Sequence, residues 1–202
     1  MDGTSPTKST TFPSYPPHLT EYSTPTIKDP NTGITLWESC AIIEYLLDIY
    51  DTEGKLHFLT SPEKYLASQY MYFQSSGQGP YFGQAVWFTH FHDEKLHSAS
   101  ERYVGEIKRV TKILDSVLEG EEYLVGGRLS YVDLAFVPWY WLVDFVDQAG
   151  GLEKELVDEN PNFKRWMMRL SERPAVRKNK EARVNDEPEY RDARPDLVSG
   201  SS

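Results

Sequence analysis

Cysteine is nearly absent from this chain, which holds a single thiol, Cys40, in 202 residues. One thiol excludes an intramolecular disulfide framework and a cysteine-based zinc site, and it is typical of a reducing compartment. No stretch approaches the roughly 18 to 20 apolar residues of a membrane-spanning helix. The first residues, Met1 to Thr11, also lack the apolar segment of a secretory signal. We therefore expect a soluble, cytoplasmic protein without membrane contacts.

Basic residues are too few for a nucleic-acid-binding protein. The chain holds 21 Lys and Arg against 31 Asp and Glu, so its formal net charge is -10. A nucleic-acid binder needs a basic stripe that neutralises phosphates, but the longest basic cluster, Arg173 to Arg183, is interrupted by Pro174 and Glu181. Aromatic residues, by contrast, make up 13% of the chain. They suit a sizeable core and an apolar binding cleft.

The histidines form no metal-binding pattern. His90 and His92 precede two acidic residues, Asp93 and Glu94, and side chains of these kinds can bind a metal ion. Two histidines spaced i, i+2 point to different faces of a helix, however. We expect a surface cluster here and no metal cofactor.

The first part of the chain predicts a β-hairpin followed by a helix. Residues 1–23 are rich in Ser, Thr and Pro, which favours an irregular or disordered segment. Two short β-prone runs, Thr26–Lys28 and Ile34–Trp37, flank a stretch dense in turn residues. Apolar residues then recur at helical spacing from Ser39 to Tyr50, with Ser39 as the expected N-cap.

A polar linker, Asp51–Pro62, leads into a region that is helical throughout. We predict one long helix from Glu63 towards Phe91, with candidate interruptions at Gly77, Gly79 and Pro80. Three more helices are expected, one over residues 103–117, one over 131–145, and one from Pro161 that stops before Pro174. The third of the four opens with Ser130 and Asp133, spaced as a capping box. The fold class is thus α+β and mostly helical.

The junction between hairpin and helix carries the most informative chemistry. Glu38 and Ser39 lie where a strand gives way to a helix, whose N-terminal N–H groups suit a ligand carboxylate. The Ser39 hydroxyl would add a donor, and the Glu38 carboxylate would bind an ammonium group. A ligand with both groups on one carbon is an α-amino acid, such as a γ-linked glutamate. Capping of the helix alone remains an alternative role for these residues.

The motifs resemble those of cytosolic glutathione transferases, in the fungal branch related to the yeast nitrogen-catabolite regulator. The similar stretches are PTIKDPNTGITLWESCAIIEYL (Pro25–Leu46), FQSSGQGPYFGQAVWF (Phe73–Phe88), EIKRVTKILDSVLEGEEYLVGG (Glu106–Gly127) and LSYVDLAFVPW (Leu129–Trp139). The similarity extends from about Thr24 to Val176. It implies a partial thioredoxin-like, glutathione-binding domain over residues 24–55, an all-helical domain over 62–184, and a polar tail over 185–202.

The resemblance also implies site residues. Pro25 would be a cis-proline, with the Thr24 backbone and the Glu38–Ser39 pair binding glutathione as co-substrate. Tyr72, Tyr81, Phe82 and Trp87 would line the pocket for a small hydrophobic substrate. Each of these aromatics could instead pack in the core or at a dimer interface. The Ser130–Asp133 motif would be the structural folding box of the family. A homodimer is a further implication.

The sequence departs from the family in its first residues. The family places a β-α-β unit, with its catalytic residue, before the hairpin, and such a unit needs roughly 30 residues or more. Only about two dozen residues precede Pro25, so we expect that the unit is missing or that the gene model is truncated. The catalytic residue is therefore unassigned. Cys40, in the first turn of a helix, and the upstream Tyr15 and Tyr22 are weaker candidates.

Two functions follow from these expectations. The first is glutathione-dependent conversion of a small electrophile, such as an intermediate of secondary metabolism. The alternative is a non-catalytic glutathione-binding or regulatory protein that acts through a protein partner, for which the acidic charge would suit a basic partner. A folded remnant that binds no ligand is a third reading.

Overall fold

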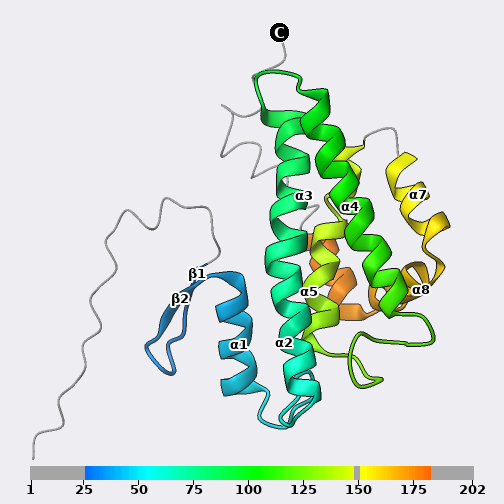
Figure 1. The fold of residues 1–202 in the computed structure, drawn as a ribbon. Coiled ribbons are helices and arrows are strands. Elements are labelled where there is room, and N and C mark those ends of the chain that lie inside the picture. The colour runs from blue at the N-terminus through cyan, green and yellow to red at the C-terminus, as the bar shows by residue number, and fades with distance from the viewer. Residues whose placement is uncertain (1–25, 148–150, 183–202) are drawn as a thin grey trace, which may run out of the picture. The chain divides into compact units, whose positions relative to one another are not determined.

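The computed structural model describes residues 26–147 and 151–182, which form two compact units divided within one helix, at Ile42 and Ile43 (Figure 1). The N-terminal segment 1–23, the residues Thr24 and Pro25, and the tail 185–202 lie outside the described residues. Among the described residues, no helix is long and apolar enough to cross a membrane.

The first unit holds the hairpin. Strands β1 (Thr26–Lys28) and β2 (Thr35–Trp37) are antiparallel, with Ile27 opposite Leu36. The turn closes because the Asp29 carboxylate accepts the N–H of Asn31 at 2.8 Å. Gly33 takes a φ of 74°, which glycine adopts without steric cost. Helix α1 (Ser39–Tyr50) follows directly, with the bounds that the periodicity predicts.

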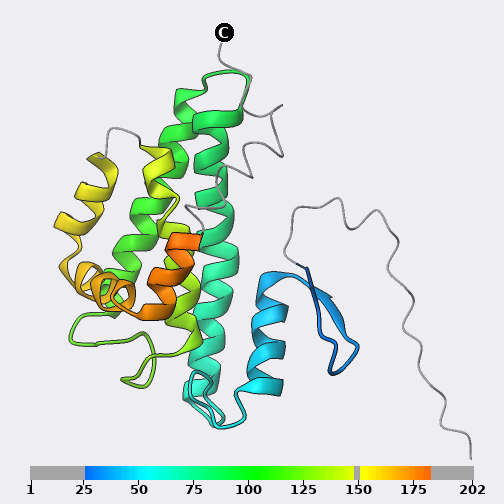
Figure 2. The same cartoon turned by 180° about the vertical axis from the view of Figure 1, so that it is seen from behind.

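The second unit is all-helical, so the predicted α+β, mostly helical fold is confirmed. Its elements are α2 (Glu63–Phe73), η2 (Gln74–Gln78), α3 (Gly79–Val86), η3 (Trp87–Phe91), α4 (His97–Val117), α5 (Tyr131–Tyr140), α6 (Val143–Val146), α7 (Gly151–Glu159) and α8 (Pro161–Ser171). A further helical stretch covers residues 174–182. Figures 1 and 2 show α3 and α4 side by side, with α8 packed against α4.

The predicted long helix from Glu63 towards Phe91 is present, and its irregularity near Gly77 and Gly79 takes the form of the π-helical segment η2, with a second such segment, η3, at its end. One helix prediction needs correction. The helix predicted over residues 131–145 ends at Tyr140 and resumes at Val143. Pro138 inside α5 lacks the N–H that would bond to the Leu134 carbonyl, which weakens the hydrogen-bond ladder in the last turn of this helix. Helix α7 was not predicted.

The core of the second unit centres on α4, α5 and α8. Its fully buried large side chains include Phe82, Ile107, Leu114, Phe136 and Trp166. Asp133 is equally buried and makes four hydrogen bonds, all to neighbours that hold the start of α5. These are the N–H and hydroxyl of Ser130 (both 2.9 Å), the N–H of Leu124 (2.9 Å) and the indole of Trp166 (3.0 Å). The capping box is thus tied directly into the core.

Candidate functional site

The junction of β2 and α1 contains a strained residue. Glu38 has a φ of 73°, the one positive φ at a non-glycine residue in the described part of the chain. This left-handed conformation costs an L-residue about 1–2 kcal/mol. Strain of this kind is found mostly at functional sites, where the surrounding structure holds it. The bend lets the chain pass from the end of a strand into the first turn of a helix within one residue.

Ser39 is not the N-cap that the sequence suggested. The first hydrogen bond of α1 runs from the N–H of Ile42 to the carbonyl of Glu38 at 2.9 Å, so Glu38 holds the cap position. The N–H groups of Ser39, Cys40 and Ala41 precede this bond and form the open, partly positive end of the helix. Within the described residues, the Ser39 hydroxyl and the Glu38 carboxylate have no hydrogen-bond partner, and both residues are exposed.

This arrangement matches the chemistry of an α-amino acid. Backbone N–H groups and a hydroxyl can bind a carboxylate at the start of α1, and the adjacent Glu38 carboxylate can bind an ammonium group. Cys40 is half-buried in the first turn. Thr24 and Pro25, expected beside this site, and the upstream Tyr15 and Tyr22 lie outside the described residues, so their roles stay predictions.

The four aromatic candidates for a substrate pocket are not gathered into one site. Phe82 is fully buried, and its ring meets that of Tyr140 edge-on at 5.2 Å, so it is part of the core. Tyr72 is 65% exposed on α2, whereas Trp87 is 45% exposed in η3. Tyr81 is half-buried, with its ring 6.3 Å from that of Tyr103.

A cavity of about 240 Å³ does occur in the second unit, among α5, α6, α7 and α8. It has an apolar floor, which includes Val143, Leu156 and Phe163. None of the four aromatic candidates lines it. Among the described residues, no group of three or more His, Cys, Asp and Glu side chains could hold a metal ion.

A second polar network, which the sequence analysis did not single out, lies where α1 ends. The Asp51 carboxylate accepts the N–H groups of Lys55, Leu56 and His57, each at 2.8 Å. Desolvation raises the pKa of Asp51, but these three donors and the nearby His57 ring together hold it below its usual range. The Arg128 side chain approaches the same segment from the helical unit. An Asp a few residues before a turn commonly binds backbone N–H groups of that turn, so the role of Asp51 has a local signal in the sequence. The contact of Arg128 with this segment has no such signal.

Comparison with known proteins agrees with this architecture. Residues 80–174 match the family model of the glutathione S-transferase C-terminal domain. A glutathione S-transferase-like protein of Aspergillus fumigatus, tpcF, is 45% identical over an alignment of 163 positions, which covers 76% of this chain and 72% of that protein. The transcriptional regulator URE2 of Saccharomyces cerevisiae is 32% identical over 71% of this chain and 49% of its own length.

A solved structure supports the same assignment. The glutathione transferase URE2P8 of Phanerochaete chrysosporium, crystallised with oxidised glutathione, superposes with a TM-score of 0.75 at 36% identity. The match covers 85% of this chain and 78% of that one, so it includes far more than the helical domain alone. The chain belongs to the glutathione S-transferase family, among relatives that include fungal and URE2-type proteins.

Proposed function

We propose that this protein binds glutathione at the start of α1 and transfers it to a small electrophile. The observation that carries the proposal is the strained Glu38, φ 73°, beside Ser39 at an open helix N-terminus. A simple helix start does not need a strained glutamate, because Gly would adopt this conformation without steric cost. The similarity to a transferase that was crystallised with oxidised glutathione supports the choice of ligand.

Each residue of the junction has a role in this proposal. The γ-glutamyl carboxylate of glutathione accepts hydrogen bonds from the first N–H groups of α1 and from the Ser39 hydroxyl. The Glu38 carboxylate binds the ammonium group on the same carbon. Thr24 and Pro25 would hold the cysteinyl part. These contacts bind and orient glutathione, and they leave its sulfur free to react.

The proposed reaction is a nucleophilic displacement or addition by the glutathione sulfur. With an aryl halide, the thiolate forms a C–S bond to the aryl carbon. The halide leaves with the bonding electron pair, and the thiol proton passes to solvent. No residue is assigned here to the activation of the thiol. The proposed substrate is an intermediate of secondary metabolism, and Tyr72, Tyr81 and Trp87 are separate candidates for contact with it.

A regulatory role is the second candidate. It is favoured by the 32% identity to a transcriptional regulator and by the net charge of -10, which suits a basic protein partner. In this case glutathione would bind without turnover. A cytoplasmic location and a homodimer are compatible with either function and belong to the proposal.

The experiment combines binding with turnover. Calorimetric titration with glutathione tests the site, and 1-chloro-2,4-dinitrobenzene then tests transfer. We expect Ser39→Ala to weaken glutathione binding, whereas the control Ser116→Ala, which removes an exposed hydroxyl on α4, leaves it unchanged. Binding without turnover would leave the regulatory function. Absence of binding by the unaltered protein would refute the assigned site.

A further inference from the structure

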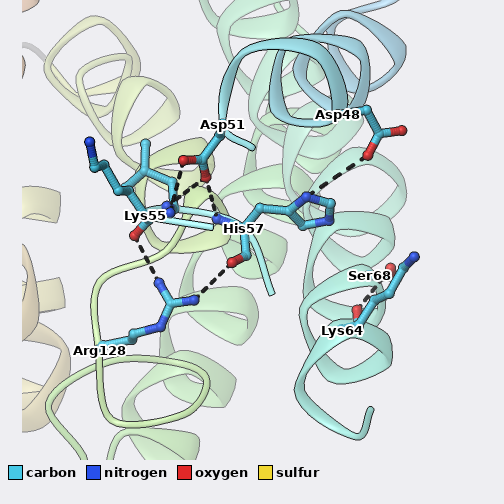
Figure 3. A network of polar contacts seen from close by, with 8 residues as sticks. Asp48, Asp51, Lys55, His57, Lys64, Ser68 and Arg128 are labelled. Carbon is cyan, nitrogen blue, oxygen red and sulfur yellow. Dashed lines mark hydrogen bonds and ion pairs between the residues drawn. The ribbon is translucent and has the colours of Figure 1, made fainter. Parts of the chain in front are cut away.

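The segment directly after α1 is held on two sides. On one side, the Asp51 carboxylate accepts three successive backbone N–H groups, those of residues 55, 56 and 57, at 2.8 Å each (Figure 3). On the other side, the Arg128 guanidinium donates to the carbonyls of Lys55 and His57, both at 2.8 Å. The N–H of Tyr131 donates to the carbonyl of Leu56 at 3.1 Å. We call Asp51, residues 55–57 and Arg128 the linker latch.

The two sides of the latch act on one shared peptide group. The Lys55 carbonyl and the Leu56 N–H belong to one planar peptide unit. Its N–H faces the Asp51 anion and its carbonyl faces the Arg128 cation, so the peptide dipole is aligned with both charges. This is an ion pair bridged by a peptide group. Hydrogen bonds arranged in such a chain polarise and strengthen one another.

The loop that carries Arg128 is held in place by its own contacts. Its guanidinium lies 4.1 Å from the centre of the Phe58 ring, in a cation–π contact. Gly126, with a φ of 63°, leaves room for that ring, because a Cβ at this position would lie 2.8 Å from it. Two residues after Arg128, Ser130 begins the capping box that ties the loop to the core. Arg128 is thus fixed through its own loop, and both it and the linker belong to the second unit.

His57 adds a further contact between the linker and α1. Its Nδ1 lies 3.8 Å from the Asp48 carboxylate in the last turns of the helix (Figure 3). The ring also meets that of Tyr131 edge-on, with 6.1 Å between centroids. The hydrogen bonds of Asp51 therefore hold the linker to the end of α1, and the Asp48–His57 approach is too long for a hydrogen bond.

We propose that Arg128 is a positioning residue for the glutathione site at the other end of α1. The helix is uninterrupted from Ser39 to Tyr50, so a latch at its last turn also limits the motion of its first turn. Within residues 26–147 the sheet beside this turn has two strands, and an isolated two-stranded hairpin is marginally stable. The claim rests on the proposed function, because it assumes that the first turn binds glutathione.

The coupling must be reciprocal. If the latch stabilises the binding-competent position of α1, then glutathione must stabilise the latch by the same factor. Glutathione should therefore slow hydrogen exchange at the amides of residues 55–57, which do not touch the ligand in this proposal.

The test uses Arg128→Gln, which removes the cation, and Arg128→Lys, which keeps the charge but cannot bind two carbonyls as a planar fork. The matched control is Arg109→Gln on α4, which removes an exposed arginine that pairs with Glu106. Glutathione affinity is measured by calorimetry, and amide exchange is followed separately in residues 55–57 and in α4.

We expect Arg128→Gln to speed exchange at residues 55–57 and to weaken glutathione binding by about tenfold, within the usual range of coupling between sites. Exchange in α4 should not change, and Arg128→Lys should recover part of the affinity. Faster exchange at residues 55–57 with unchanged affinity would overturn the positioning role and leave the proposed function intact. Failure of the unaltered protein to bind glutathione would instead refute the proposed function. If Arg128→Gln does not fold, Arg128→Lys decides alone, and unchanged affinity there with faster exchange overturns the role.

Discussion

Replacement of Glu38 separates the requirements of folding from those of binding. Glu38→Gly removes both the backbone strain and the carboxylate, whereas Glu38→Gln keeps the strain and removes the charge alone. If the strain is retained for ligand binding, the two variants should differ in stability and agree in their loss of affinity. The matched control is Glu44→Gln, which removes an exposed carboxylate from the next turn of the same helix.

The magnitudes follow from the conformation of Glu38. A glycine relieves about 1–2 kcal/mol of left-handed strain, but its greater freedom in the unfolded chain costs about 0.5–1 kcal/mol. Glu38→Gly should therefore change stability by between about 0 and 1.5 kcal/mol in the stabilising direction. Loss of a hydrogen bond to a charged group costs about 1.5–3 kcal/mol, which is roughly a 10- to 140-fold weaker affinity. Because Glu38 is exposed, we expect the lower end.

Urea unfolding followed by circular dichroism measures stability, hydrogen exchange in α1 reports the junction locally, and calorimetry measures glutathione affinity. Both Glu38 variants should bind glutathione at least about tenfold more weakly, with Glu38→Gly as stable as the unaltered protein or more so. A Glu38→Gly protein that binds normally would refute the role of the carboxylate. Marked destabilisation by Glu38→Gly would show that the glutamate serves the fold.

Three further predictions concern stability. Asp133→Ala removes a buried carboxylate with four hydrogen bonds and should lower the free energy of unfolding by about 3 kcal/mol or more, as measured by urea unfolding. The control Asp158→Ala, which removes an exposed, ion-paired carboxylate, should leave the free energy of unfolding nearly unchanged. Gly126→Ala should destabilise the protein by about 2 kcal/mol, because the new Cβ would lie 2.8 Å from the Phe58 ring at a residue with positive φ. Gly105→Ala in α4, where the new Cβ meets open space, should instead stabilise the protein by about 0.5–1 kcal/mol. Thermal unfolding of both variants checks this prediction. Because the pKa of Asp51 is lower in the folded state, its contribution to stability is fully present above the unfolded pKa of about 3.9 and is lost as pH falls below it. Asp51→Asn should therefore reduce the acid sensitivity of hydrogen exchange at the amides of residues 55–57. An unchanged pH profile of this exchange would count against the prediction.

Much of the local structure could be predicted from short stretches of sequence. The hairpin turn over residues 29–33 and the capping box of Ser130 and Asp133 each depend on a few neighbouring residues whose side chains bond to nearby backbone. The bounds of α1 also follow from its own periodicity. The Glu38–Ser39 junction was identified in the same way, as a strand followed directly by a helix, although its cap was assigned to the wrong residue.

Other features depend on residues that are distant in the chain. Helix α8 begins with its N–H groups of Asn162 and Phe163 bonded to Asp115 of α4, at 2.7 and 2.9 Å, so its cap comes from another helix. The position of α7 likewise lacked a sufficient local signal.

By itself, the sequence determined the family, the order of elements and the residues at the start of α1, because these follow from local periodicity, turn residues and recognisable motifs. The tertiary structure alone decided the φ of Glu38 and the partners of Arg128, which lie 73 and 71 residues away along the chain. A positive φ at glutamate and a peptide-bridged ion pair leave no local pattern. The ion pair arises only when packing brings separate segments together and offsets the cost of holding them there, whereas the positive φ of Glu38 is a backbone conformation that glutamate rarely adopts.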